Sequence, residues 1–498
     1  MNIAAAALAA GSRDGEAFVE AASGRRWTYG ELAEAAGGVS RALAGRGVGP
    51  GDRVALFGAN HLEYFAGWLG IVGHGSVLTT VNLLLGGPET AAIVEHLDPD
   101  VVVAEAAHLE RATAAAAGRP VVVLDEVAVP GGDELAVVPR SPDDLVAIAY
   151  TSGTTGPMPK GAVHRHAVPL AVAQGTIEAL GLRPGDPTAT FLPNFQLPAF
   201  ACTPLVSMLL GSSCLLFDRL DVPAVLDAVV ERGIAFMIAV PTALYDLVEA
   251  AERTGVRFDT LRCGPIGGAP LPPALQERAG RLGWPSANIY GSTETSGNVA
   301  VQRPGRPLRP SSCGLPAPGA RLSVRDPETG EELPTGADGE LWVGAERACL
   351  EYWRNPEATA EALVDGWFRT GDLAHFDEDG EVYVVDRVKD LIIRGGFNIA
   401  PVEVERMLMA HPEVAEAIVV GLPDERLGEI PVAYVVPATG ASPDRAALAA
   451  YARERLGPVK APARIDFVAG EDLPRGPLGK VRKPDLRALV RSGRLATT

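Results

Sequence analysis

The sequence predicts an α/β enzyme with a large N-terminal domain of mostly parallel sheets, a small β-barrel-like part and a smaller α+β C-terminal domain. Short apolar runs alternate with helical patterns, which is typical of parallel strands covered by helices. At about residues 310–385 the pattern changes to short strands and tight turns, which favours an antiparallel or barrel-like part. The composition shifts again after Lys389, and 498 residues are too many for one simple core.

The individual elements follow from periodicity. Residues 32–43 carry apolar side chains at helical spacing. Apolar, β-branched runs predict buried strands at residues 53–57, 101–103, 120–124, 147–150, 234–240 and 289–290. In the last part we expect a helix at 401–410, a strand at 415–420 and a helix at 444–456, with Ser442 and Pro443 as the start signal before that last helix. We therefore expect an N-terminal domain at residues 1–388 and a C-terminal domain at 389–498.

Composition narrows the class of protein. The net charge of −18 argues against nucleic acid or an anionic membrane as the main partner. Two stretches without charged side chains, residues 64–88 and 187–217, are interrupted by glycine, proline and polar residues, so they predict buried core and no membrane span. The five cysteines are dispersed and form no zinc pattern, which predicts free thiols in a reducing cytoplasm.

A loop rich in hydroxyl groups and glycine is the first candidate for chemistry. Thr151-Ser-Gly-Thr-Thr-Gly156 is followed by Lys160, and backbone N–H groups in such a loop can wrap a polyphosphate. The chain contains no Walker A motif, no Gly-x-Gly-x-x-Gly and no Gly-x-Ser-x-Gly, which disfavours dinucleotide binding and serine hydrolysis. A plain flexible turn remains the alternative interpretation of this loop.

Three further residues carry a functional and a structural interpretation each. Glu294, in Tyr290-Gly-Ser-Thr-Glu-Thr295, can hold Mg²⁺ against nucleotide phosphates or serve as a partner at a helix N-cap. Asp372 can accept hydrogen bonds from both ribose hydroxyls or stabilise a turn after glycine. Lys480, on a loop rich in proline and glycine, either projects into a site or is a solvated surface lysine.

Together these segments resemble the adenylate-forming superfamily of acyl-CoA synthetases, firefly luciferase-like enzymes and nonribosomal adenylation domains. The motif matches run from about Tyr150 to Lys483, whereas residues 1–140 match only in general rhythm. The resemblance implies ATP, Mg²⁺ and CoA as cofactor and co-substrates. It also implies that the C-terminal domain is a mobile lid that rotates about a hinge at Lys389 between two half-reactions.

The resemblance implies an ATP site as well. Its residues are Thr151, Ser152, Gly153, Thr154, Thr155 and Lys160 at the phosphates, Gly268, Ala269 and Pro270 along the adenine, Asn288 near its exocyclic amine, Tyr290 stacking on it, Gly291 and Ser292 beside these, and Asp372 and Arg387 at the ribose. By the same resemblance Thr293 contacts the α-phosphate or the substrate carboxylate. Glu294 holds Mg²⁺, and Lys480 bridges the carboxylate and the α-phosphate. Gly395 and Gly396 line a pantetheine tunnel.

The sequence departs from the family pattern at three places. Three residues, Pro157-Met158-Pro159, separate glycine from Lys160, where the family usually has two. Gln196 stands where many relatives carry histidine, and Gly476 replaces the usual threonine before the lysine loop. These departures bear on the reach of Lys160 and on any histidine gate.

The acyl substrate is predicted from a missing charge. No Asp or Glu occurs between Thr188 and Phe217, and a buried substrate ammonium without a partner is strongly disfavoured. The candidate pocket residues are mostly apolar: Phe195, Gln196, Leu197, Phe200, Val240 and Thr242. We therefore predict an acyl-CoA synthetase for an uncharged, hydrophobic carboxylic acid, acting as a monomer or homodimer. The alternatives are loading of the acyl group onto a carrier protein and a non-catalytic nucleotide-binding protein.

Overall fold

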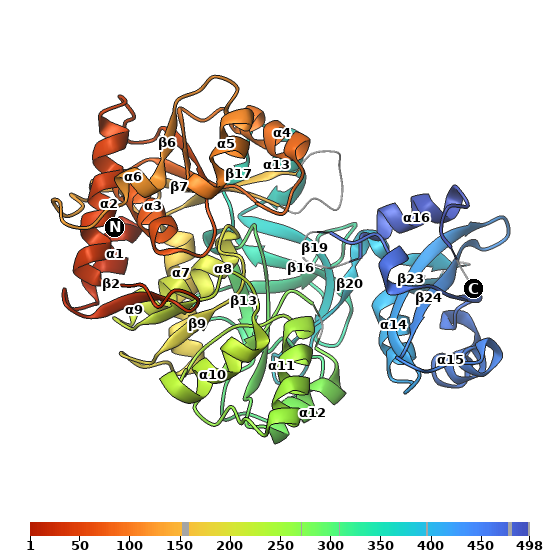
Figure 1. Ribbon diagram of the computed structural model, residues 1–498. Helices are drawn as coiled ribbons and strands as arrows, with labels where there is room; N and C mark the ends of the chain where they lie inside the picture. Colours follow the sequence, from red (N-terminus) through yellow and green to blue (C-terminus); the bar gives the residue numbers. More distant parts are fainter. Residues whose placement is uncertain (152–158, 270, 308, 395–396, 477–480, 497–498) are drawn as a thin grey trace. The chain divides into compact units, whose positions relative to one another are not determined.

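The computed structural model describes residues 1–151, 159–269, 271–307, 309–394, 397–476 and 481–496 (Figure 1). The chain divides into two compact units. The first comprises Met1–Leu322, Val343–Arg369 and Gly380–Val382, and the second comprises Ser323–Trp342, Thr370–Asp379 and Tyr383–Thr498. A domain boundary at Lys389 and a lid that rotates about it stay predictions. Within the described ranges, no helix is long and apolar enough to cross a membrane.

A seven-stranded sheet forms the first layer of unit one. Its order is β17-β8-β7-β4-β3-β5-β6, with bounds β3 Arg53–Phe57, β4 Val77–Thr80, β5 Val101–Ala104, β6 Val121–Val123, β7 Leu145–Tyr150, β8 Gly161–Arg165 and β17 Glu351–Tyr352. The strands β3 to β7 pair in parallel, and β8 and β17 pair antiparallel at one edge. The strands expected at 53–57, 101–103, 120–124 and 147–150 are therefore confirmed.

Helices cover both faces of this sheet, as the alternation along β3 requires. Val54 and Leu56 join the cluster with α2 (Tyr29–Ala44) and α3 (Leu62–Gly73). Ala55 and Phe57 join the cluster with α4 (Gly87–Leu97) and α5 (Leu109–Ala116). Short helices η1 (Ala106–His108) and α6 (Leu124–Val127) lie in the connections. Helix α2 starts at a capping box in which Thr28 and Glu31 satisfy each other's backbone N–H groups.

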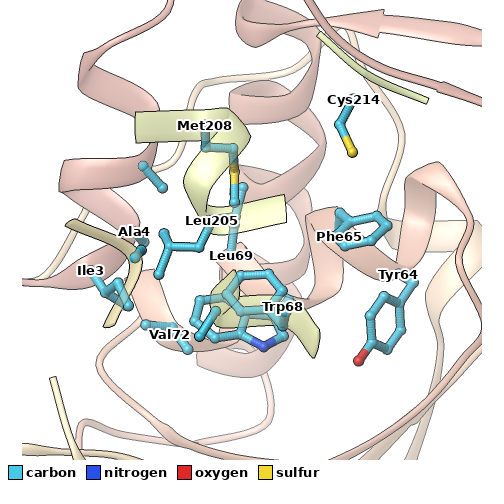
Figure 2. Close-up of a cluster of buried hydrophobic side chains, with 14 of the residues drawn as sticks. Ile3, Ala4, Tyr64, Phe65, Trp68, Leu69, Val72, Leu205, Met208 and Cys214 are labelled. Carbon is cyan, nitrogen blue, oxygen red and sulfur yellow. The ribbon is translucent and has the colours of Figure 1, made fainter. Parts of the chain in front are cut away.

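Helix α3 is buried on all sides. Trp68 and Leu69 belong to one buried cluster with Leu205 and Met208 of α9 (Pro204–Leu209) and Ile3 of α1 (Ile3–Ala9) (Figure 2). The ring of Trp68 stacks on that of Phe200 with centroids 3.9 Å apart. The charge-free stretch is therefore core at residues 64–81, as predicted, whereas its last part is not, because Leu84 and residues 86–88 are exposed.

Two four-stranded sheets complete unit one. One has the order β2-β1-β10-β9, with β1 Glu16–Glu20, β2 Arg26–Thr28, β9 Thr188–Thr190 and β10 Cys214–Leu216; the other has the order β11-β12-β13-β14, with β11 Gly264–Ile266, β12 Ser286–Ser292, β13 Gly297–Val301 and β14 Leu315–Pro316. The helices are α7 Ala167–Leu180, α8 Leu197–Cys202, α10 Val222–Arg232, α11 Pro241–Thr254 and α12 Pro273–Arg281. The strand expected at residues 234–240 is wrong: only isolated bridges form there, at Phe236 and Ala239.

The part at residues 310–385 consists of short strands, as predicted. Its sheet has the order β15-β16-β19-β18, with β20 paired to β19; the bounds are β15 Leu322–Arg325, β16 Gly339–Gly344, β18 Leu363–Val364, β19 Trp367–Phe376 and β20 Val382–Arg387. Helices η2 (Ala345–Arg347) and α13 (Pro356–Ala362) lie between its strands.

The C-terminal part of unit two is α+β. Its sheet has the order β22-β21-β24-β23 with β25 parallel to β24; the bounds are β21 Ile392–Arg394, β22 Phe397–Ile399, β23 Val414–Asp424, β24 Gly428–Pro437 and β25 Arg464–Phe467. The helices are η3 Val388–Asp390, α14 Pro401–Met409, α15 Arg445–Lys460, η4 Gly470–Asp472 and α16 Lys483–Arg491, and α15 is kinked at Gly457. The predicted elements at 401–410, 415–420 and 444–456 are confirmed. The predicted start is not, because the N-cap of α15 is Asp444 and not Ser442.

Candidate active site

The two residues that flank the candidate phosphate loop, Thr151 and Lys160, lie at the closed end of a hairpin. Strands β7 and β8 pair in register up to Tyr150 opposite Gly161. The next residues close the hairpin, because the Thr151 amide donates to the Lys160 carbonyl at 2.9 Å and the Lys160 amide donates to the Thr151 hydroxyl at 3.3 Å. The loop residues Ser152, Gly153, Thr154 and Thr155 lie outside the described residues. The hairpin therefore fixes where Lys160 leaves the loop.

The second motif occupies the β12–β13 hairpin. A β-bulge falls between Tyr290 and Gly291. A Cβ added at Gly291 would lie 2.0 Å from the carbonyl oxygen of Gly297, so only glycine fits this close crossing. The bulge and this contact set the direction in which the chain enters the turn that carries Thr293 and Glu294.

That turn is held by its own hydroxyl groups. The Ser292 amide donates to Thr295 Oγ1 at 3.0 Å, and this hydroxyl donates to the Gly297 carbonyl at 2.6 Å. The Ser296 amide donates to the Thr293 carbonyl at 3.1 Å. Thr293 and Glu294 are thus displayed on a short, internally bonded turn.

Sequence reasoning missed a histidine that secures this turn. Ser296 has φ of 56°, a left-handed conformation that is uncommon for a non-glycine residue. Its hydroxyl lies 2.8 Å from Nδ1 of His164, which is fully buried on β8. Burial lowers the pKa of His164 to about 3, so the ring is neutral at physiological pH. His164 and Ser296 stand 132 residues apart, and nothing in their spacing indicates the contact.

Tyr352 is the second residue that sequence reasoning missed. Its hydroxyl donates to Glu294 Oε1 at 2.8 Å, and its ring centroid lies 4.7 Å from the ammonium of Lys160. The backbone of Glu294 is held by the same segment, because the Cys349 amide donates to the Glu294 carbonyl at 2.7 Å. The structure therefore brings together the first two predicted motifs, through a tyrosine that belongs to neither.

The residues around Glu294 fit a magnesium ion that is shared with a nucleotide. Among the described residues, no group of three or more His, Cys, Asp or Glu side chains can enclose a metal. Mg²⁺ does not need such a cage, since it takes one or two carboxylates together with phosphate oxygens and water. The hydroxyl oxygen of Ser292, two residues away, is buried and has no hydrogen-bond partner among the residues that the structure describes. Glu294 supplies one carboxylate near the candidate phosphate loop, and one carboxylate is enough protein ligand for Mg²⁺ that also binds phosphate oxygens and water.

The predicted adenine wall is partly described. Gly268 has φ of 79°, and a Cβ there would lie 3.5 Å from Cγ1 of Val240, which is one of the acyl-pocket candidates. Ala269 is exposed, and Pro270 lies outside the described residues. The amide nitrogen of the Asn288 side chain donates to the Ser312 carbonyl at 2.9 Å. Tyr290 packs beside a cluster that contains Val299 and Val343.

The acyl-pocket candidates have different surroundings. Leu197 and Phe200 are buried on α8, and the Phe200 ring is engaged by Trp68 in the core. Gln196 is the N-cap residue of α8, and the Phe195 carbonyl accepts a hydrogen bond from Thr80. Thr242 is exposed at the start of α11. The pocket that these residues were predicted to form stays a prediction.

The two ribose candidates meet within the second unit. The Arg387 Nε donates to Asp372 Oδ1 at 2.9 Å. The Asp372 amide donates to the Thr370 hydroxyl at 3.0 Å, and Gly371 between them has φ of 70°. Asp372 lies within strand β19, so its interpretation as a turn residue is wrong, and its carboxylate is paired with the Arg387 guanidinium. Its role at a ribose stays a prediction.

Three of the remaining predicted residues, Lys480, Gly395 and Gly396, lie outside the described residues. The backbone at residue 389 belongs to η3. Cys202, Cys214, Cys263 and Cys349 are free thiols, as predicted.

Comparison with known families identifies the chain. The family model for the AMP-binding enzyme matches residues 6–353, and the model for the AMP-binding enzyme C-terminal domain matches residues 403–480. The fatty acid–[acyl-carrier-protein] ligase ScoC of Streptomyces coeruleorubidus is 36% identical over 481 residues, which cover 93% of this chain and 92% of that protein.

Two further relatives agree with the family models. The feruloyl-CoA synthase of an Amycolatopsis species is 35% identical over 466 residues, which cover 93% of this chain and 94% of that protein. The crystal structure of ATP-bound MatB from Rhodopseudomonas palustris superposes with a TM-score of 0.92 at 30% identity and covers 99% of both chains. The chain therefore belongs to the AMP-binding enzyme family of adenylate-forming acid–thiol ligases.

Proposed function

We propose that this protein is an ATP-dependent acyl-CoA synthetase for an uncharged, hydrophobic carboxylic acid. The observation that carries the proposal is that Tyr352 contacts both Lys160, over its ring, and Glu294, through its hydroxyl. A cation and a carboxylate suited to a metal ion therefore lie near the candidate phosphate loop. The family match supplies the reaction class.

In the first half-reaction a carboxylate oxygen of the substrate attacks the α-phosphorus of ATP. An O–P bond forms, the bond to the β-phosphate oxygen breaks, and pyrophosphate leaves with the bonding electrons. Two anions meet in this step, so fixed positive charge at the transition state is the main requirement. We assign this charge to Lys480, with Thr293 donating its hydroxyl at the α-phosphate or the carboxylate. Mg²⁺ held by Glu294 would neutralise charge on the phosphates.

In the second half-reaction the sulfur of CoA attacks the acyl carbon of the acyl-adenylate. A C–S bond forms, the C–O bond to AMP breaks, and the thiol proton is released. We assign Gly395 and Gly396 to the pantetheine path, Asp372 and Arg387 to the ribose, and Lys389 to the hinge between the half-reactions. The mixed anhydride must be shielded from water while the thiol arrives, which a closing lid achieves.

The relatives support CoA as the acceptor and keep one alternative open. The feruloyl-CoA synthase uses CoA by its name and takes an aromatic acid, which agrees with an uncharged, hydrophobic acyl group. ScoC is a ligase for an acyl-carrier protein by its name, and it favours the carrier-protein alternative.

A panel of carboxylic acids tests the proposal. Each acid is incubated with MgATP and either CoA or a phosphopantetheinylated acyl-carrier protein, and the thioester is measured by mass spectrometry. We expect acyl-CoA from aromatic, alicyclic or medium-chain acids and none from amino acids. Thioester on the carrier protein alone would replace CoA by the alternative, and thioester with neither acceptor from any acid would refute the proposal.

A further inference from the structure

We propose that Tyr352 is a positioning residue of the ATP site that aims the Glu294 carboxylate at the metal and holds the Lys160 ammonium apart from it. The proposal rests on the function proposed above, because it takes Glu294 as a metal ligand and Lys160 as a phosphate ligand. No predicted motif contains Tyr352.

The backbone around Tyr352 is fixed by the strand that follows the phosphate loop. Strand β17 pairs with β8, with Tyr352 opposite Ala162. The pairing continues on both sides, since the Trp353 amide donates to the Gly161 carbonyl at 2.7 Å and the Leu350 amide donates to the Val163 carbonyl at 2.8 Å. The position of Tyr352 relative to Lys160 is therefore set by a hydrogen-bonded ladder.

The same segment grips Glu294 at two points. Its carbonyl accepts from the Cys349 amide, and its Oε1 accepts from the Tyr352 hydroxyl at 2.8 Å. Tyr352 is only 6% exposed, so this hydrogen bond is shielded from water. A carboxylate held through one oxygen presents the other in a defined direction, which suits Mg²⁺ coordination through a single oxygen.

Tyr352 contacts the two charged groups with different parts of its side chain. The ammonium of Lys160 lies over the ring, 4.7 Å from its centroid, and the hydroxyl at the far end of the same ring contacts Glu294. The face of an aromatic ring attracts a cation without neutralising it. The ammonium therefore stays available to phosphate oxygens, and the second carboxylate oxygen stays available to the metal.

A binding measurement isolates the role of the hydroxyl. The Tyr352→Phe variant keeps the ring under Lys160 and removes only the donor to Glu294. By calorimetry, we expect wild type and variant to bind ATP equally in EDTA. With Mg²⁺ present, the variant should bind ATP about 10- to 100-fold more weakly, which is the usual loss when a partner of a metal ligand is removed.

Two further variants show whether Tyr352 acts through Glu294. Glu294→Gln should lose the Mg²⁺-dependent gain in ATP affinity, and adding Tyr352→Phe to it should cause no further loss, because the two residues form one unit. Tyr29→Phe is the matched control: its buried hydroxyl donates to the Ser212 carbonyl at 2.9 Å, remote from these motifs in the chain, and its loss should leave both affinities unchanged.

Each outcome decides the proposal. Equal MgATP affinities of wild type and Tyr352→Phe, additive losses in the double variant, or weaker ATP binding of Tyr352→Phe in EDTA would each overturn it. The proposed function fails separately. If the affinities change as expected but no carboxylic acid supports pyrophosphate exchange, Tyr352 keeps its role and the ligase reaction is wrong.

Discussion

At the residue scale, the candidate site depends on a few close contacts in and around the β12–β13 hairpin. Gly291 lets two strands of a hairpin cross where a Cβ would collide with the Gly297 carbonyl. His164 holds a strained serine one residue beyond Thr295. Neither residue is assigned a reacting atom, yet both determine where Thr293 and Glu294 are presented.

Replacing Gly291 by alanine should damage the hairpin. The added methyl group would sit 2.0 Å from the Gly297 carbonyl oxygen, and overpacking of this kind costs about 1–3 kcal/mol or more. Chemical denaturation measures the loss, and adenylation should fall with it. Gly280→Ala on α12, where a Cβ meets nothing within 4 Å, is the control and should be neutral or stabilising. Equal stabilities of the two variants would contradict the contact.

The buried histidine should make stability depend on pH. The pKa of His164 is about 3 in the folded chain against an ordinary value of 6.5, so the unfolded chain binds the extra proton between these values. The contribution of neutral His164 to the unfolding free energy is complete above pH 6.5 and is lost as the pH falls toward 3.

The His164→Gln variant keeps a hydrogen-bonding partner for Ser296 but cannot titrate. In urea titrations the slope of unfolding free energy against pH, between pH 6.5 and 4, should fall by up to about 1.4 kcal/mol per pH unit. Above pH 7 the slopes of both proteins should agree. A variant that retains the full acid slope would show that His164 is not its source.

At the element scale, apolar runs predicted strands well wherever a strand pairs along its length. β3 and β5 are buried on both faces and read as continuous apolar runs. Residues 234–239 are equally buried but pair only through isolated bridges. The strand prediction failed there because an apolar run indicates burial, and burial is common to strands and to buried connections. The two-residue strand β17 is too short for any periodicity.

The same limit applies to the site. Motif chemistry predicted Glu294 and Lys160, since their residue types and neighbours indicate phosphate and metal binding. Tyr352 and His164 stand 58 and 132 residues from their partners, and a single sequence holds no signal for such contacts.

The observed N-cap of helix α15, Asp444, can be tested against the start signal predicted at Ser442. The Asp444 side chain accepts from the Ala447 amide at 2.7 Å, so Asp444→Ala should cost about 1 kcal/mol of unfolding free energy. Ser442→Ala should change nothing measurable by the same denaturation assay. A larger loss from Ser442→Ala than from Asp444→Ala would restore the start signal read from the sequence.

At the scale of the whole molecule, one chain must catalyse two half-reactions. The family match covers both an AMP-binding part and its C-terminal domain, so the parts required for both steps are present in this chain. The family match does not show whether the C-terminal domain of this chain rotates between the two half-reactions. The proposed hinge at Lys389 can be tested by mutation.

A proline at the proposed hinge should separate the half-reactions. Lys389→Pro fixes φ near −65°, so it should leave carboxylate-dependent pyrophosphate exchange intact and block thioester formation. Lys389→Ala is the control and should support both. Unchanged overall turnover in the proline variant would remove Lys389 from the hinge.

The central claim is that this chain joins a carboxylate to AMP with the help of Lys480. The most direct measurement is exchange of labelled pyrophosphate into ATP, made with the acid that the panel selects. We expect exchange that requires the acid and falls at least about two orders of magnitude in Lys480→Ala, while thioester formation from supplied acyl-AMP is nearly retained. Exchange at the wild-type rate in that variant, or an equal loss in both half-reactions, would contradict it.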